Sequence, residues 1–297
     1  MADTFYACLV HYRDPEAIRR SLAEMEGWSR LPIGVVIVDN SGDLPDDVAE
    51  VGRATAMPVT VVDPGGNVGY AAAANIGIRI AAAHGVPYVL LLTQDAELEP
   101  PAAERLGRCL DEHEGVAVAA PVLGFSSRRH EVFSAGGALT RRARPKHLRQ
   151  GAMLGTPVPT EIRDVDWADG ACLMVRVADA DSVKGLPEEY FLYVEEIDFL
   201  HALRRRGRRV VVVDGAVAYQ EPGNFTLYLK HRNLLHFSRK YPVDFRPWPW
   251  LLVLCRDLVG AFRRGKPWDV AWGLRGVVDA RRGRMGPPPT RLFDMRA

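Results

Sequence analysis

The stretch Gly34-Val35-Val36-Ile37-Val38-Asp39-Asn40-Ser41-Gly42 decides the fold. Its first five residues are apolar and mostly β-branched, which predicts a strand buried on both faces. The polar residues that follow favour a turn where this strand ends. Strands of this kind belong to sheets that helices cover on both sides. The stretch therefore indicates an α/β protein.

Apolar runs and helical spacing alternate on either side of this stretch. They predict strands at residues 4–11, 59–62 and 88–92, and helices at residues 15–25 and 70–83. This order is typical of a mostly parallel central sheet that helices flank on both faces. We therefore expect a Rossmann-like first half that binds a nucleotide at the carboxyl ends of its strands.

The second half is less regular. We expect strands at residues 116–120, 171–177 and 210–213, a helix at 195–206, and a polar, Arg-rich excursion at 126–160. Amphipathic helices follow Asn224 and are interrupted by prolines. We divide the chain into an α/β domain, residues 1–224, with halves 1–95 and 96–224, and a C-terminal basic helical extension, residues 225–297.

Composition and charge narrow the class of protein. The chain is 47% hydrophobic and 25% charged, which is ordinary for a globular protein. Its four cysteines form no Cys-x-x-Cys pair, which argues against a zinc site and a disulfide framework and predicts a cytoplasmic protein.

The last 73 residues carry a large excess of positive charge. From Phe225 to Ala297 there are 15 Lys and Arg against 5 Asp, a net charge of +10, and four of the six tryptophans. Such a tail suits an anionic surface, and we expect peripheral contact with the inner face of a membrane rather than with nucleic acid. The alternative is a set of amphipathic helices packed on the catalytic domain.

Polar clusters follow three of the expected strands: His11-Tyr12-Arg13, Asp39-Asn40 and Gln94-Asp95. Ligands of open parallel sheets bind at such ends. A carboxylate at Asp39 could accept hydrogen bonds from a base or a ribose. The alternative is that Asp39-Asn40-Ser41-Gly42 is only a turn.

The segment from Asn67 to Gly77 places small residues four apart. Gly69, Ala73 and Gly77 would form a smooth helix face that allows close approach to the sheet. Asn67 stands where an amide could cap this helix or reach a ligand. The alternative is an alanine-rich packing helix with an Asn cap. Neither a P-loop nor a G-x-G-x-x-G turn occurs in the N-terminal half, which disfavours kinases and dehydrogenases.

In combination these motifs resemble the family-2 inverting glycosyltransferases, especially bacterial rhamnosyltransferase-like members. The resemblance rests on Val35–Ser41, the pattern Asn67-x-Gly69-x-Ala71-x-Ala73-x-Asn75-x-Gly77, Leu91–Asp95, Asp169–Val175 and Phe191–Asp198. It covers about residues 4–241. It implies a GT-A fold and transfer of a hexosyl unit from a nucleotide-diphosphate sugar to a hydroxyl acceptor. Residues 1–224 would then be the catalytic domain, with residues 1–95 as the nucleotide-sugar-binding half and residues 96–224 as the half that supplies the acceptor site and the base.

The resemblance also implies roles for single residues. Asp39 would contact the nucleobase or ribose, and Glu196 would be the general base, at a position where the family carries aspartate. Arg232 matches an Arg-Asn pair near the diphosphate; the alternative is a solvated arginine on a helix. The remaining donor-side residues are His11, Arg13, Asn40, Asn67, Gly69, Asn75 and Gln94, and the acceptor-side residues are Asp169, Gly170, Glu195 and Asp198. Without the resemblance, Glu195, Glu196 and Asp198 would be the acidic first turn of a helix.

A divalent cation, Mg²⁺ or Mn²⁺, is implied at Asp95, which matches the last aspartate of the family's Asp-x-Asp motif. Thr93 stands where relatives often have the first acidic residue, and Gln220 where many have a histidine. Both departures weaken the expected metal site.

The resemblance favours rhamnose on dTDP as the donor, and a glycan, a lipid-linked glycan or a natural product as the acceptor. Two other functions remain open: a nucleotide-sugar-binding protein without catalysis, and a nucleotidyltransferase on a similar sheet. No Gly- and Arg-rich triphosphate loop near the N-terminus supports the second.

Overall fold

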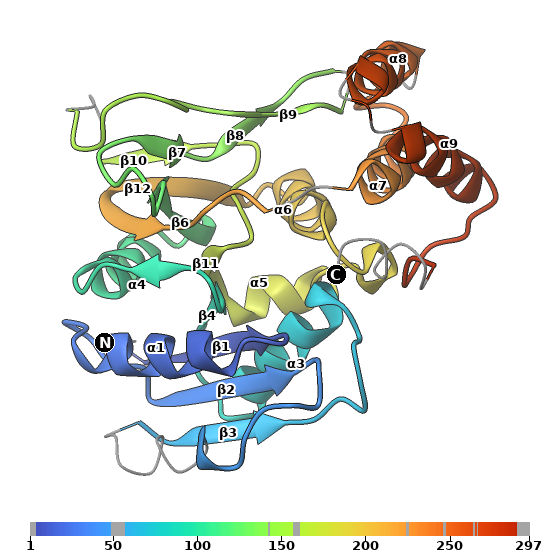
Figure 1. The fold of residues 1–297 in the computed structure, drawn as a ribbon. Helices are drawn as coiled ribbons and strands as arrows, with labels where there is room; N and C mark the ends of the chain where they lie inside the picture. The colour runs from blue at the N-terminus through green and yellow to red at the C-terminus, as the bar shows by residue number, and fades with distance from the viewer. Residues whose placement is uncertain are drawn as a thin grey trace.

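A computed structural model describes residues 4–48, 57–141, 143–156, 161–223, 226–245, 248–263, 265 and 267–289. A single large sheet crosses the molecule, and its strands lie side by side in the order β10-β12-β6-β11-β4-β1-β2-β3 (Figure 1). The bounds of these strands, in chain order, are β1 Phe5–His11, β2 Gly34–Asp39, β3 Val59–Val62, β4 Tyr88–Thr93, β6 Val116–Gly124, β10 Ile162–Asp164, β11 Cys172–Arg176 and β12 Arg209–Tyr219.

The sheet is mostly parallel. Strands β1 to β4 form a parallel block, and β12 is parallel to β6. Strand β11 lies between β4 and β6 and is antiparallel to both. The amino end of β11 therefore lies beside the carboxyl end of β4, which brings the segment before Cys172 to the ligand-binding edge.

Helices cover both faces of the sheet, as the alternation of strands and helices predicted. Side chains at alternate positions of β2 enter opposite cores. Val36 and Val38 join a cluster with α3 (Tyr70–Ala83), α5 (Val177–Ser182) and α6 (Glu195–Arg205). Val35 and Ile37 join a second cluster with α1 (Pro15–Glu26) and α4 (Ala102–Glu112).

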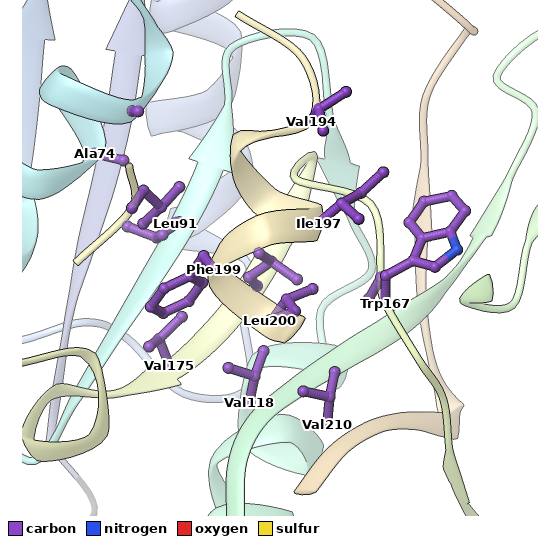
Figure 2. Close-up of a cluster of buried hydrophobic side chains, with 14 of the residues drawn as sticks. Ala74, Leu91, Val118, Trp167, Val175, Val194, Ile197, Phe199, Leu200 and Val210 are labelled. Carbon is purple, nitrogen blue, oxygen red and sulfur yellow. The ribbon is translucent and has the colours of Figure 1, made fainter. Parts of the chain in front are cut away.

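Helix α6 is anchored at the centre of the first core. Val194, Ile197, Phe199 and Leu200 are buried, and Figure 2 shows Trp167 beside Ile197. This packing holds the first turn of α6, which carries Glu195 and Glu196, at a fixed place relative to the sheet.

The predicted small-residue face of α3 is present. A Cβ atom on Gly77 would lie 2.3 Å from Sγ of Cys8 on β1, so glycine permits the close packing of this helix on the sheet. Three helices end the chain: α7 (Leu227–Lys240), α8 (Trp248–Arg263) and α9 (Pro267–Arg281). Figure 1 shows α7 and α9 on the side toward which β1 and β2 point. The division of the chain at residue 224 stays a prediction.

The expected excursion at 126–160 contains regular structure. Strand β7 (Val132–Ser134) pairs with β6, and β8 (Gly137–Leu139) forms an antiparallel hairpin with β9 (Pro145–His147). The remaining short elements are β5 (Glu97–Leu98), which pairs with β12, and the 3-10 helix η1 (Glu188–Tyr190). The sequence pattern did not predict these strands, because arginines and glycines in the hairpin interrupt the alternation of apolar and polar residues that indicates a strand.

Candidate functional site

The carboxyl ends of β1, β2 and β4 lie side by side. His11 is in register with Asp39, and Val10 with Thr93. The three polar clusters that follow these strands therefore meet at one edge, which we call the donor edge: residues 11–13, 39–43 and 93–95.

Asp39 is buried and organises its own turn. Oδ1 accepts hydrogen bonds from the backbone N–H groups of Ser41 (3.0 Å) and Gly42 (2.8 Å), and Oδ2 accepts one from Leu44 (3.1 Å). Burial raises the pKa of Asp39, but these three donors outweigh it and hold that pKa below its ordinary value. The turn and ligand interpretations of Asp39 are therefore compatible, because a carboxylate held in this way stays charged.

His11 adds an imidazole to this edge. Its Nε2 lies 2.9 Å from Oδ1 of Asp43 and 3.9 Å from Oδ1 of Asp39. The ligand atoms of these three side chains lie within 4.8 Å of one another, so the group could hold a metal ion. Its oxygens are already engaged by backbone and hydroxyl groups. Asp43 was not predicted, although it follows Gly42 in the same polar turn.

Other predicted donor-side residues brace the backbone of this edge. Gln94 accepts from the N–H of Tyr12 (2.8 Å) and donates to its carbonyl (2.9 Å). Asn40 donates to the carbonyl of Gly69 (3.2 Å), which joins β2 to the start of α3. Arg13 is exposed, has a positive φ of 56° and donates its N–H to Oγ of Ser41. These contacts hold the edge in one shape.

The two asparagines of the α3 motif lie in different surroundings. Asn67 is exposed, and its Oδ1 accepts from the N–H of Gly69, the N-cap residue of α3. Asn75 is buried, and its amide bonds both the N–H and the carbonyl of Leu186 at 2.8 Å. The observed contacts of Asn75 are with the protein, so its donor role stays a prediction.

Asp95 lies beside Thr93 and Gln220, the two residues that depart from the family pattern. The Nε2 group of Gln220 donates to the two carboxylate oxygens of Asp95 (3.0 and 3.1 Å) and to Oγ1 of Thr93 (3.2 Å). Asp95 itself is exposed. The fold thus brings Thr93, Asp95 and Gln220 together, and the metal role of Asp95 stays a prediction.

Asp169 and Gly170 lie next to this edge because β11 is antiparallel to β4. The N–H of Thr93 donates to the carbonyl of Ala171 (2.9 Å). The Tyr70 hydroxyl donates to the carbonyl of Gly170 (2.6 Å), and a Cβ atom on Gly170 would lie 3.5 Å from Cβ of Glu196. The structure therefore brings the predicted base against the predicted acceptor-side loop.

Three carboxyl groups meet here and repel one another; we call Asp169, Glu195 and Glu196 the carboxyl cluster. Burial raises the pKa of Glu195 to about 7. Burial, and then the charge of Glu195, raise the pKa of Glu196 well above its ordinary value, and burial raises that of Asp169. A carboxylate with a raised pKa is a stronger base than an ordinary one.

Two buried oxygens of this cluster, Oδ2 of Asp169 and Oε2 of Glu195, lack a hydrogen-bond partner in the described chain, and so does Nδ1 of the neighbouring His147. Nδ1 of His147 lies 3.7 Å from Oδ1 of Asp169, and the His147 ring contacts Phe133 and Trp167. Unsatisfied buried groups are costly, so their gathering marks a place where a polar ligand binds. Sequence reasoning missed His147 because the hairpin that carries it was read as a loop.

The loop before Glu195 is strained. Phe191, Tyr193 and Val194 have positive φ angles of 69°, 69° and 79°. Side chains other than glycine rarely adopt this conformation, which costs about 1–3 kcal/mol for each residue. Such strain persists only where neighbouring groups fix the backbone.

Arg232 and Asn233 of α7 fix this loop. The Asn233 amide donates to the carbonyls of Tyr190 (3.3 Å), Leu192 (2.9 Å) and Tyr193 (2.7 Å). Arg232, fully buried, donates to the carbonyls of Tyr190 and Gly286. The alternative of a solvated Arg232 is therefore wrong, since burial of its side chain leaves it no solvent. Its predicted contact with a diphosphate stays a prediction.

Asp198 supports the same loop from the other side. It is buried and accepts from the hydroxyls of Tyr190 (2.7 Å) and Tyr241 (2.6 Å) and from Nζ of Lys240 (2.7 Å). These bonds tie α6 to Tyr190 and to the end of α7.

Known proteins resemble this chain in sequence. The family model described as "Glycosyl transferase family 2" matches residues 6–165. The chain is 26% identical over 239 residues to an N-acetylglucosaminyl-diphospho-decaprenol L-rhamnosyltransferase of Mycobacterium tuberculosis, covering 73% of this chain and 75% of that one. It is 24% identical over 258 residues to the low-salt glycan biosynthesis hexosyltransferase Agl10 of Haloferax volcanii (78% and 75%).

Solved structures share the fold. GalNAc-T7 with UDP, GalNAc and Mn²⁺ aligns with a TM-score of 0.62 at 13% identity, over 81% of this chain, and this chain spans about half the length of that one (51%). The Pyrobaculum calidifontis mannosyltransferase PcManGT, solved with GDP-Man and Mn²⁺, aligns with a TM-score of 0.54 at 15% identity (98% and 78%). In the described residues, no helix is long and apolar enough to span a bilayer.

Proposed function

Because the chain belongs to glycosyl transferase family 2, we propose that its site moves one hexosyl unit from a nucleotide-diphosphate sugar to a hydroxyl acceptor with inversion. The observation that carries this proposal is the carboxyl cluster beside the donor edge, with its unsatisfied buried oxygens. The rhamnosyltransferase relative supports a rhamnosyl donor.

Glu196 is the group that removes the proton in this proposal. An inverting displacement needs a base on the face of the sugar opposite the leaving nucleotide, so that the acceptor oxygen is deprotonated as it attacks. Burial raises the pKa of Glu196, and repulsion from Glu195 and Asp169 raises it further. This raised pKa favours proton uptake by Glu196. The charged Asp39 turn holds the base or ribose on the other side of the site.

A divalent cation fits at Asp95. Mg²⁺ is often held by one or two carboxylates and completed by substrate phosphates. Asp95 supplies one exposed carboxylate, and the Thr93 hydroxyl lies beside it. When bound, the ion would offset the charge that develops on the leaving diphosphate. Because the amide N–H of Gln220 occupies both Asp95 oxygens, the ion must displace Gln220 from them.

The proposal is tested by Glu196→Gln. This isosteric change should lower kcat by about 10²–10⁴-fold, because no carboxylate then accepts the proton, while the Kd of the donor nucleotide should stay within about twofold. Donor binding is measured by thermal shift against a panel of nucleotide diphosphates with and without Mg²⁺ or Mn²⁺. Unchanged turnover would remove Glu196 from the mechanism, and tight nucleotide binding without transfer by the native enzyme would indicate a non-catalytic binding protein.

We also propose peripheral contact with the inner face of a membrane, which would present a lipid-linked acceptor to a cytoplasmic enzyme. Five of the ten large hydrophobic side chains exposed in the described chain lie on α8 and α9, although these helices supply only 31 residues. They are Val259, Phe262, Trp268, Leu274 and Val278.

Helix α9 has an apolar face on both sides. Gly276 packs so closely on α7 that a Cβ atom there would lie 2.3 Å from the Tyr228 carbonyl oxygen, while Leu274 and Val278, roughly opposite Gly276 around the helix, are exposed. Exposed arginines such as Arg263 and Arg281 accompany this outer face. Aromatic and cationic side chains together suit an anionic headgroup region. Trp268→Ala with Phe262→Ala should reduce sedimentation with phosphatidylglycerol vesicles, and undiminished sedimentation would contradict the contact.

A further inference from the structure

His147 lies at one end of the carboxyl cluster, and the proposed transfer gives it no role. Its Nδ1 is buried, lies 3.7 Å from Oδ1 of Asp169 and has no hydrogen-bond partner in the described chain. The side chain as a whole is 27% exposed. Since Nδ1 itself is buried, this exposure belongs to the rest of the side chain. The imidazole therefore connects a buried carboxyl group to the solvent.

The hairpin and its neighbours fix the orientation of this ring. Its centroid lies 5.0 Å from that of Phe133 and 5.0 Å from that of Trp167, and both of these side chains are buried. His147 is in register with Gly137 on β8, whose N–H donates to the Trp167 carbonyl (2.8 Å). A Cβ atom on Gly137 would lie 2.1 Å from the Trp167 indole, so glycine leaves room for that ring. The imidazole is thus packed in place beside Asp169.

Charged groups of both signs lie near the ring. Asp169 carries the one carboxylate of the described residues that lies within ion-pair distance of His147. Arg144, Lys146 and Arg149 line, together with His147, a hollow of about 730 Å³. Lys146 precedes His147 on β9 and is exposed, so its side chain points to the opposite face of the strand. The ring therefore has the carboxyl cluster at Nδ1 and a hollow through which water and small buffer molecules reach it.

Asp169 links this ring to the proposed base. A Cβ atom on Gly170 would lie 3.5 Å from Cβ of Glu196, and burial, the charge of Glu195 and that of Asp169 raise the pKa of Glu196. Nδ1 of His147 lies about 0.5–1 Å beyond hydrogen-bond length from Asp169, a gap that a small side-chain shift or one water molecule closes. A line of proton-accepting groups thus runs from Glu196 through Asp169 to His147 and the solvent.

We propose that His147 carries to the solvent, through Asp169, the proton that Glu196 takes from the acceptor. This inference rests on the proposed transfer function and adds a residue that resets the site between turnovers. As the acceptor oxygen bonds to the anomeric carbon and the bond to the leaving diphosphate breaks, the hydroxyl proton passes to Glu196. It then passes to Asp169 and to Nδ1 of His147, and the imidazolium releases a proton to water. An imidazole suits this step because it takes up and releases protons near neutral pH.

The test separates the first turnover from later ones. In His147→Ala the deprotonated Glu196 is present at the start, so the rate constant of a single turnover, with enzyme in excess over donor, should stay within about twofold of the native value. The steady-state kcat should fall by about tenfold or more, because Glu196 then loses its proton without a relay. Both are measured by quenched flow with dTDP-rhamnose and octyl N-acetylglucosaminide, or with the pair that turns over fastest in a panel of nucleotide sugars and alkyl glycosides.

Added imidazole supplies a second measurement, because the His147 ring borders a hollow that a small base can enter. Imidazole should raise the kcat of His147→Ala in proportion to the concentration of its neutral form, which a purely structural role would not produce. His147→Gln keeps a polar side chain but relays no proton, and should show the same fall in kcat. The matched control His130→Ala removes an exposed histidine from the same excursion and should leave kcat unchanged with and without imidazole.

An unchanged steady-state kcat in His147→Ala would overturn the inference. A single-turnover rate constant that fell together with kcat, without recovery in imidazole, would also overturn it and make His147 a packing residue. Absence of transfer by the native enzyme with every pair, or unchanged turnover in Glu196→Gln, would instead contradict the proposed function, so the two failures are distinguishable.

Discussion

At the donor edge, Asp39, Asn40 and Gln94 use their side-chain oxygens and amides to bond nearby backbone groups. On the acceptor side, Asp169 and Glu195 each keep a buried oxygen without a partner in the described chain. These three side chains of the donor edge are thus already hydrogen-bonded within the protein, whereas the acceptor side holds three repelling carboxyls next to a strained loop. Substitutions at the two places should differ accordingly: the first should weaken the fold, and the second should weaken the reaction.

The largest effect on kcat in this comparison is expected at Asn233, whose hydrogen bonds hold the strained loop on the acceptor side. Asn233→Asp keeps the shape of the side chain but removes the N–H groups that bond three carbonyls of the strained loop. The loop should relax and move Glu196, so kcat should fall by about 10²-fold, as small displacements of catalytic groups do. The KM for the donor should change little.

The matched control is Ser238→Ala, which removes another buried hydrogen bond of α7, from Oγ of Ser238 to the Leu235 carbonyl, away from the loop. Both variants are compared by thermal melts and by steady-state kinetics. If Asn233→Asp lowered kcat no more than Ser238→Ala at equal loss of Tm, the brace would be purely structural and the contrast between the two sides would weaken.

An intermediate effect is expected for pH. Transfer needs a deprotonated base, and burial and the charge of Glu195 raise the pKa of Glu196 well above its ordinary value, so log kcat should still rise with pH where an ordinary carboxyl group has already lost its proton. Glu195→Gln removes a charge that raises the pKa of Glu196. The acid limb of the profile should therefore move to lower pH, and an unmoved limb would exclude coupling between the two groups.

The stability of the folded protein should change with pH in the direction opposite to kcat. The folded-state pKa of Glu195 is raised, so the folded protein binds more protons than the unfolded chain between about pH 4.5 and pH 7. Stability should fall as pH rises through this window. At pH 8, Glu195→Gln should thus raise Tm, by about 2–4 °C for each kcal/mol recovered, whereas Asp39→Asn at the donor edge should lower it. A lower Tm for Glu195→Gln would show that its burial is compensated.

The sequence predicted the donor edge well, because buried strands and polar ends are local patterns. The fold class and the family membership are confirmed, and β3 and α3 begin and end where expected. The acceptor side depends on contacts between segments far apart in the chain. His147 meets Asp169 from a hairpin whose short strands and arginines gave no periodic signal, and Asn233 meets Tyr193 from 40 residues away.

Arg232 shows why motif matching alone assigns a residue but not its contacts. Its position in the Arg-Asn pair was recognised, yet burial of the whole guanidinium and its bonds to two carbonyls follow only from the packing of α7 against the 190–194 loop. No pattern within ten residues of Arg232 encodes that packing.

The smallest effect is expected at Asp95, where the donor edge is least satisfied. Gln220→His would replace an amide that occupies both Asp95 oxygens with an imidazole, which is a metal ligand in its neutral form. The Kd for Mn²⁺ in the presence of nucleotide should fall by about threefold to tenfold, a gain of about 0.7–1.4 kcal/mol in binding free energy. Thr93→Ser retains the hydroxyl beside Asp95 and serves as the control. Calorimetric titration of Mn²⁺ measures both variants. If Gln220→His bound Mn²⁺ no better than the native protein, Gln220 would not limit the site, and the cation would depend on the donor diphosphate more than on the protein.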